Sequence, residues 1–358
     1  ARAAIYELEK FRMKAMVLRA YNAPLEFQEV ETPTPGAREA LVRVFACGSG
    51  LTLHHSVTGN TPVNLPAILG HEVVGEVIAL GEQAEGLAVG ERVTLHGLLF
   101  CGQCRLCLTG REPLCESMGG MIGRQRNGGY AEYMTAPDRN WIKLPPGMLD
   151  RCGPTAACVV ADAVATPYKV ARHANLRPME TCVVYGAAGG VGIHLIQIAK
   201  LRGARVIGVD IGAGKLAAVA KEGADEGIDA QTHDVAAEIR RLTGGRGADV
   251  IADFVGTSDT LANSVAALAK GGRVVIVGLS RASEAMISTG AAPLLMAEQS
   301  ILGSRAFTRV EIAECLALVA SGVLRPVVNH VYPLAQANEA HALVGSGRNI
   351  GRVSLSIG

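Results

Sequence analysis

Four cysteines lie close together in one short segment, with the spacing C-x₂-C-x₂-C-x₇-C: Cys101, Cys104, Cys107 and Cys115. Thiolates held by short loops form a tetrahedral sulfur site, which is the preferred structural site for Zn²⁺. The alternatives are a pair of disulfides or four unrelated buried thiols. The segment is punctuated by Gly and Arg and no secretory signal is visible, so we expect zinc. Since protein would fill all four positions around the ion, this zinc would support the fold and leave no position for a substrate.

The length and the charge of the chain exclude several classes of protein. A chain of 358 residues predicts two domains. It carries 34 basic and 33 acidic residues without long runs of one sign, so neither nucleic acid nor an anionic membrane is expected as a partner. No apolar run is long enough to cross a bilayer, and no signal peptide is visible. Nine cysteines without a secretory address indicate the reducing cytoplasm.

The hydrophobic pattern changes near Pro154. Before it, short apolar segments bounded by Gly and Pro predict a β-rich domain with long loops. After it, strands and helices alternate with short glycine turns between them. This alternation predicts an α/β fold with a doubly wound parallel sheet. The strands expected in that sheet are Thr181–Tyr185, Arg205–Asp210, Val250–Phe254 and Arg273–Leu279.

A glycine-rich turn follows the first of these strands and predicts a dinucleotide site. Glycines allow a tight turn and let backbone N–H groups approach a pyrophosphate at a helix N-terminus. Asp210 ends the next strand, where a carboxylate can bind both ribose hydroxyls and would repel a 2′-phosphate, so we expect NAD rather than NADP. Lys215, one helical turn onward, could reach the ribose; an α/β domain without a nucleotide is the alternative. The residues expected at the pyrophosphate are Gly186, Gly189, Gly190, Val191 and Gly192.

Two more motifs stand in the β-rich half, Cys47-Gly48-Ser49-Gly50 and Gly70-His71-Glu72. Together with the cysteine loop and the glycine-rich turn, they resemble the zinc-dependent medium-chain alcohol dehydrogenases over residues 13–358. The resemblance implies a GroES-like β-rich catalytic domain, a Rossmann domain and a C-terminal return to the first domain. It also implies a homodimer or homotetramer. The expected segments are an N-terminal extension at 1–12, the catalytic domain at 13–163, the Rossmann domain at 164–306 and the returning tail at 307–358.

The resemblance also implies a second, catalytic zinc, and hence two zinc ions per subunit. Cys47 and His71 match the first two ligands of the family. Counting back from the stretch Thr166–Lys169 gives Asp162 as the third ligand, where the family commonly has Cys. An Asp is an acceptable zinc ligand. Cys158, four residues earlier, is the competing candidate, and Glu72 lies close to the metal in the family.

Other residues of the implied site either differ from those of the family or allow two interpretations of their role. Gly50 stands where the family usually has an Asp that hydrogen-bonds to the zinc-binding His, and Glu72 could substitute for it. Ser49 matches the hydroxyl that bonds the substrate alcohol and passes its proton outward. His54 and His55 are either the outer end of that relay or solvated loop residues. Arg352 matches a family arginine that contacts the pyrophosphate.

The reaction implied by the resemblance is the reversible oxidation of a small alcohol to an aldehyde or ketone. Zinc lowers the pKa of the bound hydroxyl, and the alkoxide transfers hydride to NAD. Two rival functions remain open. One is a different reaction on the same scaffold, such as enone reduction or C–C hydrolysis coupled to redox chemistry. The other is a nucleotide-binding protein without turnover.

Overall fold

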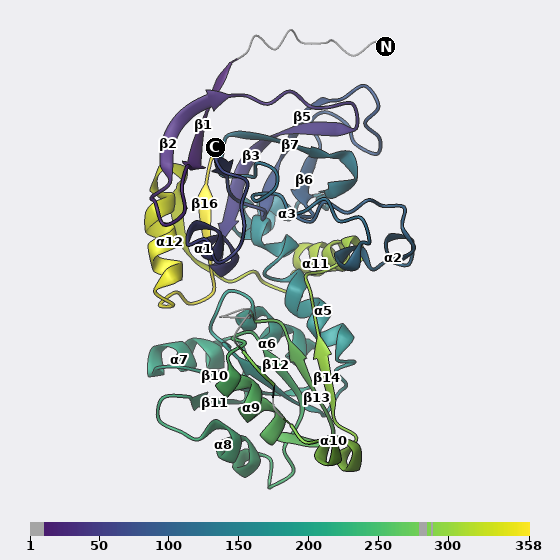
Figure 1. Cartoon of the computed structure of the whole chain (residues 1–358), viewed down its shortest axis with the longest axis vertical. Helices are drawn as coiled ribbons and strands as arrows, with labels where there is room; N and C mark the ends of the chain where they lie inside the picture. The colour runs from purple at the N-terminus through teal and green to yellow at the C-terminus, as the bar shows by residue number, and fades with distance from the viewer. Residues whose placement is uncertain (1–10, 279–284, 288) are drawn as a thin grey trace.

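The computed structural model describes residues 11–278, 285–287 and 289–358 and consists of two lobes (Figure 1). Most of the predicted N-terminal extension, residues 1–10, lies outside the described residues. The first lobe, at the top of Figure 1, is β-rich. It holds a three-stranded sheet, β2-β1-β4, and a larger sheet in the order β15-β16-β3-β5-β6-β8, with β7 paired to β3. The strands are β1 Arg12–Leu18, β2 Glu26–Glu31, β3 Glu39–Ser49, β4 Ala67–Ile68, β5 Val73–Leu80, β6 Arg92–Leu95, β7 Tyr133–Pro137, β8 Trp141–Lys143, β15 Val328–Pro333 and β16 Arg352–Ser356.

Short helices pack around these sheets. Buried apolar side chains from the strands, such as Val42, Val44 and Val93, form the core of the lobe. The α-helices are α1 Leu51–Val57, α2 Arg105–Leu108, α3 Met148–Cys152, α4 Pro154–Ala157, α11 Arg309–Ala320 and α12 Ala337–Gly345. The 3₁₀ helices are η1 Glu112–Leu114, η2 Asp138–Asn140, η3 Cys158–Ala161 and η4 Leu334–Gln336.

The second lobe is built on a six-stranded parallel sheet in the order β11-β10-β9-β12-β13-β14. Its central strands are buried on both faces, which is why they read as continuous apolar runs. The predicted fold class is confirmed. The strands are β9 Thr181–Tyr185, β10 Arg205–Asp210, β11 Glu226–Asp229, β12 Ala248–Asp253, β13 Leu268–Ile276 and β14 Ser300–Gly303. The helices are α5 Ala165–His173, α6 Gly192–Leu201, α7 Ala213–Lys221, α8 Val235–Leu242, α9 Ser258–Ala266 and α10 Ala291–Ala297.

The last strand of the chain belongs to the first lobe. β16 pairs antiparallel with β3 and parallel with β15, although it follows the whole second lobe in sequence. Just before β16, the N–H of Gly351 donates a 2.8 Å hydrogen bond to the carbonyl oxygen of Ala188, in the second lobe. The returning chain therefore touches both lobes at this point.

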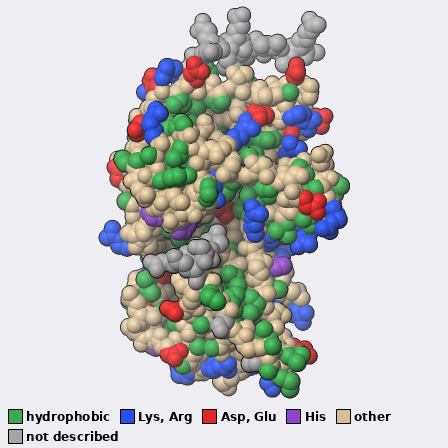
Figure 2. All heavy atoms as spheres, viewed as in Figure 1, with side chains coloured by type: hydrophobic (Ala, Val, Ile, Leu, Met, Phe, Trp, Pro, Cys, Tyr) green, Lys and Arg blue, Asp and Glu red, His purple; other side chains and the backbone are tan. Residues whose placement is uncertain are grey.

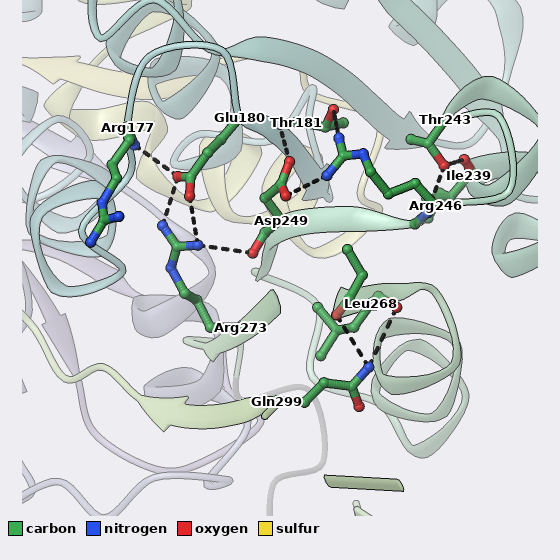
Figure 3. Close-up of polar contacts among 12 residues, drawn as sticks. Arg177, Glu180, Thr181, Ile239, Thr243, Arg246, Asp249, Leu268, Arg273 and Gln299 are labelled. Carbon is green, nitrogen blue, oxygen red and sulfur yellow. Dashed lines mark hydrogen bonds and ion pairs between the residues drawn. The ribbon is translucent and has the colours of Figure 1, made fainter. Parts of the chain in front are cut away.

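Ion pairs link neighbouring strands at the end of the parallel sheet that lies opposite the glycine-rich turn (Figure 3). The guanidinium of Arg273 donates a 2.7 Å hydrogen bond to Glu180, and both side chains are mostly buried. The N–H of Thr181 donates to the carboxylate of Asp249 at 2.8 Å, and Arg246 pairs with the same carboxylate. These contacts tie the first residues of β9 and β12 to the middle of β13 and leave the other end of the sheet for a ligand.

Among the residues that the structure describes, no helix is both long enough and apolar enough to span a membrane.

Candidate functional site

The four cysteines of the predicted structural zinc site come together around helix α2. The Sγ atoms of Cys101 and Cys107 lie 3.9 Å apart, and those of Cys104 and Cys115 lie 4.0 Å apart. Thiolates bound tetrahedrally to Zn²⁺ would be separated by about 3.8 Å, so this spacing fits the ion. Backbone N–H groups of the loop, led by that of Cys107, lower the pKa of the Cys104 thiol to about 6 and so favour a thiolate. The loop has the donor set and the geometry of a closed structural zinc site.

The glycine-rich turn lies between β9 and α6, as a dinucleotide site requires. Gly186 has a φ of +69°, a conformation that favours glycine. A Cβ built on Gly192 would overlap the carbonyl oxygen of Gly186, so the start of α6 packs directly on the turn. Backbone N–H groups at such a junction are suited to a pyrophosphate.

Asp210 lies beside this turn at the end of β10. One oxygen of its carboxylate accepts a 2.8 Å hydrogen bond from the N–H of Ala188, and the other accepts from Lys215 Nζ at 3.0 Å. The side chain is only 6% exposed. The two residues predicted to contact the ribose are therefore in contact with each other, and the carboxylate is held against the turn that would bind the phosphates.

A second polar cluster lies in the first lobe and consists of His71, Glu72 and Asp162. One potential ligand atom from each residue lies within 4.8 Å of the other two. His71 Nε2 is 3.1 Å from Asp162 Oδ2, and the hydroxyl of Thr166 donates to Asp162 Oδ1 at 2.7 Å. Burial opposes the ionised form of Asp162, but the hydrogen bond from His71 and the charge of Arg352 outweigh it and hold the pKa of the carboxyl below its usual range. Asp162 is thus a fixed, ionised carboxylate.

Arg352 completes this cluster. Its guanidinium pairs with both carboxylate oxygens of Glu72 and lies 3.5 Å from Asp162 Oδ2. The side chain of Arg352 is 7% exposed and that of Glu72 is fully buried. The carbon chain of Arg352 runs along Gly190, in the glycine-rich turn. Arg352 was expected at the pyrophosphate; its guanidinium lies between the carboxylates and the glycine-rich turn, because Nε and Nη2 donate to Glu72 while Nη1 lies next to Gly190, and the pyrophosphate contact stays a prediction.

Cys47 and Ser49 lie outside the group formed by His71, Glu72 and Asp162, but Cys47 is next to it: burial raises the pKa of its thiol, and the backbone N–H of Glu72 opposes that rise. Side chains alternate between the two faces of a strand, and Cys47 faces the core of the first lobe, where its Sγ lies near Gly70 and Gly129. Ser49 is buried on the same face, and its Oγ has no hydrogen-bond partner among the described residues. The positions that face the cluster are Gly48 and Gly50, because a Cβ on Gly48 would overlap Glu72 and one on Gly50 would overlap Arg352. The predicted roles of Cys47 as a zinc ligand and of Ser49 as a proton relay stay predictions.

The remaining predicted residues lie around the cluster. The competing ligand Cys158 is buried, and its Sγ lies 3.3 Å from Ser354 Oγ, outside the group formed by His71, Glu72 and Asp162. His54 packs against Gly345 at the end of α12, and His55 Nδ1 lies 3.4 Å from the side-chain amide of Asn60. Both histidines lie on α1, and the structure shows no contact between them and Ser49.

Two further residues at the site were not identified from the sequence. The hydroxyl of Thr166 holds the carboxylate of Asp162 in place. Thr166 lies four residues after Asp162, one helical turn onward, and this spacing was the signal that the sequence offered. Arg124 is half-buried and donates to Ser56 Oγ and to the carbonyl oxygen of Thr52 on α1. Its charge contributes to the lowered pKa of His71, whose main cause is burial. Nothing in the sequence around Arg124 marks it.

The residues present fit part of a catalytic zinc site. The ligand atoms of His71, Glu72 and Asp162 lie within 4.8 Å of one another, and the 3.1 Å between His71 Nε2 and Asp162 Oδ2 is close to the separation of about 3.3 Å expected for two ligands of one zinc ion. The oxygens of Glu72 are engaged by Arg352, so His71 and Asp162 are the residues of this group that would hold the ion, which would lower the pKa of a bound hydroxyl. The catalytic zinc remains a prediction.

Comparison with known proteins identifies the scaffold. Residues 36–146 match the family described as alcohol dehydrogenase GroES-like domain, and residues 190–321 match the family described as zinc-binding dehydrogenase. The chain is 32% identical to an NAD-dependent alcohol dehydrogenase of Sulfurisphaera tokodaii, over 96% of this chain and 99% of that protein. It is 31% identical to an acryloyl-coenzyme A reductase of Metallosphaera sedula, over 96% of this chain and all of that protein.

A solved structure of an NAD-dependent alcohol dehydrogenase superposes with a TM-score of 0.88 at 35% identity, over 97% of this chain and all of that one. These similarities confirm the predicted NAD-dependent oxidoreductase acting on alcohols, and with it the predicted NAD and structural zinc. They favour an enzyme over a nucleotide-binding protein without turnover. The chain belongs to the zinc-dependent medium-chain alcohol dehydrogenase family.

Proposed function

We propose that this protein transfers hydride between a small alcohol and NAD at the cluster of His71, Glu72 and Asp162. The observation that carries the proposal is the path of Arg352. Its carbon chain lies along Gly190 in the glycine-rich turn, while its guanidinium pairs with Glu72. One side chain therefore spans from the expected pyrophosphate position to the polar cluster, so a bound dinucleotide would lie next to that cluster.

The residues of the cluster have distinct proposed roles. The hydrogen-bonded pair of His71 and Asp162 holds the hydroxyl group of the substrate and takes its proton as hydride leaves the carbon. Thr166 keeps the carboxylate of Asp162 in one orientation. The backbone of the turn and the carboxylate of Asp210 fix the cofactor, so that the nicotinamide and the substrate carbon meet in one geometry.

The test is a panel of primary, secondary, cyclic and aromatic alcohols, with NAD⁺ reduction followed by absorbance. We expect turnover with at least one class and a primary isotope effect with the alcohol deuterated at the reacting carbon. Asp162→Asn should lower kcat by about 10²-fold or more, in the range of general acid–base groups. Asp225→Asn is the matched control, because Asp225 pairs with Lys200 on the surface of the second lobe. An unchanged kcat in Asp162→Asn would contradict the proposed role.

A second candidate reaction is the reduction of an α,β-unsaturated thioester by NADH. The specific observation that favours it is the arginine in the cluster, a buried cation 3.5 Å from Asp162 Oδ2 that could bind a carbonyl oxygen. The similarity to a protein named acryloyl-coenzyme A reductase agrees with it. Oxidation of NADH in the presence of a short enoyl thioester tests this reaction on the same preparation.

We also propose that the subunit self-associates through the edge of the parallel sheet. Within the described residues, β14 is the last strand of that sheet and pairs only with β13. Leu295 and Met296, on the adjacent helix α10, are 75% and 79% exposed. Figure 2 shows apolar side chains at the lower end of the molecule, where Figure 1 places α10. An open edge next to exposed apolar residues favours a dimer or tetramer, which light scattering would measure.

A further inference from the structure

We propose that Arg124 binds a carboxylate group of the substrate, so that the alcohol oxidised by this protein is a small hydroxy acid. The inference rests on the proposed function in placing the substrate at the cluster of His71, Glu72 and Asp162. It concerns the part of the substrate that does not react. The carbon that bears the hydroxyl gives its hydride to NAD⁺ and the hydroxyl gives up its proton, while the carboxylate stays unchanged and is held by the arginine. The inference applies whether or not a metal ion is bound at the cluster.

Arg124 lies on a segment of backbone that packs directly against the residue before His71. A Cβ built on Gly123 would lie only 2.8 Å from the backbone nitrogen of Gly70. On the other side of Arg124, the N–H of Gly129 donates a 2.9 Å hydrogen bond to the carbonyl oxygen of Gly70. The segment is therefore fixed beside the cluster, and the charge of Arg124 is near enough to contribute to the lowered pKa of His71, whose main cause is burial.

The guanidinium of Arg124 is turned toward helix α1, which follows the strand whose glycines face the cluster. Its Nε donates to Ser56 Oγ at 3.2 Å and its Nη2 donates to the carbonyl oxygen of Thr52 at 3.4 Å. Nη1 donates to none of the described residues, and the side chain is only half-buried, so a ligand can reach it. One edge of the guanidinium is thus fixed by the protein, and another edge is free to bind a ligand.

The charge of Arg124 has no counter-charge in the described part of the chain. Burial lowers its pKa, and no carboxylate among those residues opposes this effect. Other arginines that are withdrawn from solvent do have an acidic partner, since Arg126, Arg273 and Arg352 each pair with a glutamate. A cation that is partly removed from water without such a partner is costly, and the binding of an anion relieves that cost.

The carboxylates of the cluster are engaged elsewhere. Glu72 is paired with Arg352, and Asp162 is hydrogen-bonded to His71. The missing anion therefore comes with the substrate. A carboxylate matches the free edge, because Nη1 and Nη2 present two parallel N–H groups to its two oxygens. An arginine at this place selects hydroxy acids over neutral alcohols and orients them with the hydroxyl toward His71.

The experiment compares hydroxy acids with alcohols in which a methyl group replaces the carboxylate: lactate with 2-propanol, 3-hydroxybutyrate with 2-butanol and 4-hydroxybutyrate with 1-butanol. In the wild type, the kcat/KM of at least one hydroxy acid should exceed that of its partner by about 10-fold to 150-fold, the range for a hydrogen bond to a charged group. Arg124→Gln should abolish this preference, and Arg124→Lys should keep part of it. Arg241→Gln, which removes an arginine with a 68% exposed side chain on α8, is the matched control and should keep the whole preference.

A purely structural role of Arg124 predicts a different result. If the arginine only ties its segment to α1, Arg124→Gln will lower the kcat/KM of both members of a pair and leave their ratio unchanged. That result would overturn the proposal, and so would a wild type that prefers none of the three acids. If Arg124→Gln does not fold, Arg124→Lys decides: its ammonium offers no fork of two donors, so an unchanged ratio in that variant would count against the carboxylate site.

A binding measurement separates this inference from the proposed function. Butyrate has no hydroxyl and cannot react. In calorimetric titrations with NADH present, it should bind to the wild type and to Arg241→Gln, and about 10-fold or more weakly to Arg124→Gln. Equal binding to Arg124→Gln, or tighter binding of inorganic phosphate than of butyrate to the wild type, would contradict a carboxylate site. If none of the alcohols is oxidised, the proposed reaction fails, whereas the titration still decides the role of Arg124.

Discussion

Arg352 and Glu72 form a buried ion pair between the last strand of the chain and a loop 280 positions earlier. Two charges removed from water are tolerated only while each satisfies the other. The stability of the first lobe therefore depends on both residues, whatever reaction the cluster performs.

Arg352→Met keeps the length of the side chain and removes its charge. We expect a loss of about 3–5 kcal/mol in the free energy of unfolding, because the carboxylate of Glu72 is left buried without a partner. Urea denaturation measures the loss. In Arg19→Met the arginine is 53% exposed and its partner Glu26 is 54% exposed, so that control should lose about 1 kcal/mol or less. Equal losses in the two variants would show that Glu72 is not held by Arg352.

Asp210→Ala removes the carboxylate that faces the expected ribose. We expect the Kd for NADH to rise about 10-fold to 150-fold, the range for losing a hydrogen bond to a charged group. The variant should also discriminate less against NADPH, because the repulsion of a 2′-phosphate is gone. Fluorescence titration with both cofactors measures the two effects. Asp225→Asn, whose carboxylate pairs with Lys200 away from the turn, should bind NADH as the wild type does.

Cys107→Ser removes one thiolate from the structural zinc site. The zinc content should fall by one per subunit, and the loop around α2 should become sensitive to protease, because the ion holds four separate points of this loop together. Cys152→Ser is the control, since that thiol lies outside the loop and donates only to the carbonyl oxygen of Met148. Unchanged zinc in Cys107→Ser would show that the four cysteines do not bind the ion together.

Three buried histidines should make the protein sensitive to mild acid. Burial lowers the pKa of His96, His194 and His341 to about 4. The unfolded chain takes up these protons near pH 6.5, well before the folded protein does, so the stabilisation is complete above pH 6.5 and is lost as the pH falls toward 4. The effect is on the order of 3 kcal/mol per histidine by pH 4.

Melting temperatures between pH 8 and pH 4.5 measure this loss. His194 serves as the example, because Nδ1 faces the carbonyl oxygen of Gly190 and Nε2 accepts from the N–H of Val327. His194→Gln should be less stable at pH 8 but should show a shallower decline with falling pH. A decline as steep as that of the wild type would rule out His194 as one of the responsible groups.

The parts of the structure that the sequence predicts well are those set by local spacing. The cysteine loop and the glycine-rich turn are each complete within about fifteen residues, and backbone geometry alone demands their residue types. Asp210 follows from the same logic, since it ends the next parallel strand. The pairing of His71 with Asp162, 91 positions apart, came only from the resemblance to the family.

The part of the site that the sequence does not show has one physical origin. Cys47 and Ser49 came from the resemblance to the family, but a strand directs alternate residues to opposite faces. The face of β3 that contacts the cluster is set by the pairing of β3 with β16. That strand contributes Arg352 from the far end of the chain. No local pattern contains that register, so the sequence could not show that glycines, and not the cysteine and the serine, face the carboxylates.

The position of β16 also has a consequence for the order in which the protein can assemble. The chain is made from its N-terminus, and domains generally fold as units while synthesis proceeds. The parallel sheet of the second lobe has all of its strands once Gly303 has been added, whereas the sheet of the first lobe lacks an interior strand until residues 352–356 emerge. The lobe that is synthesised first is therefore completed last, and a ribosome that stops a few residues early leaves Glu72 without its partner.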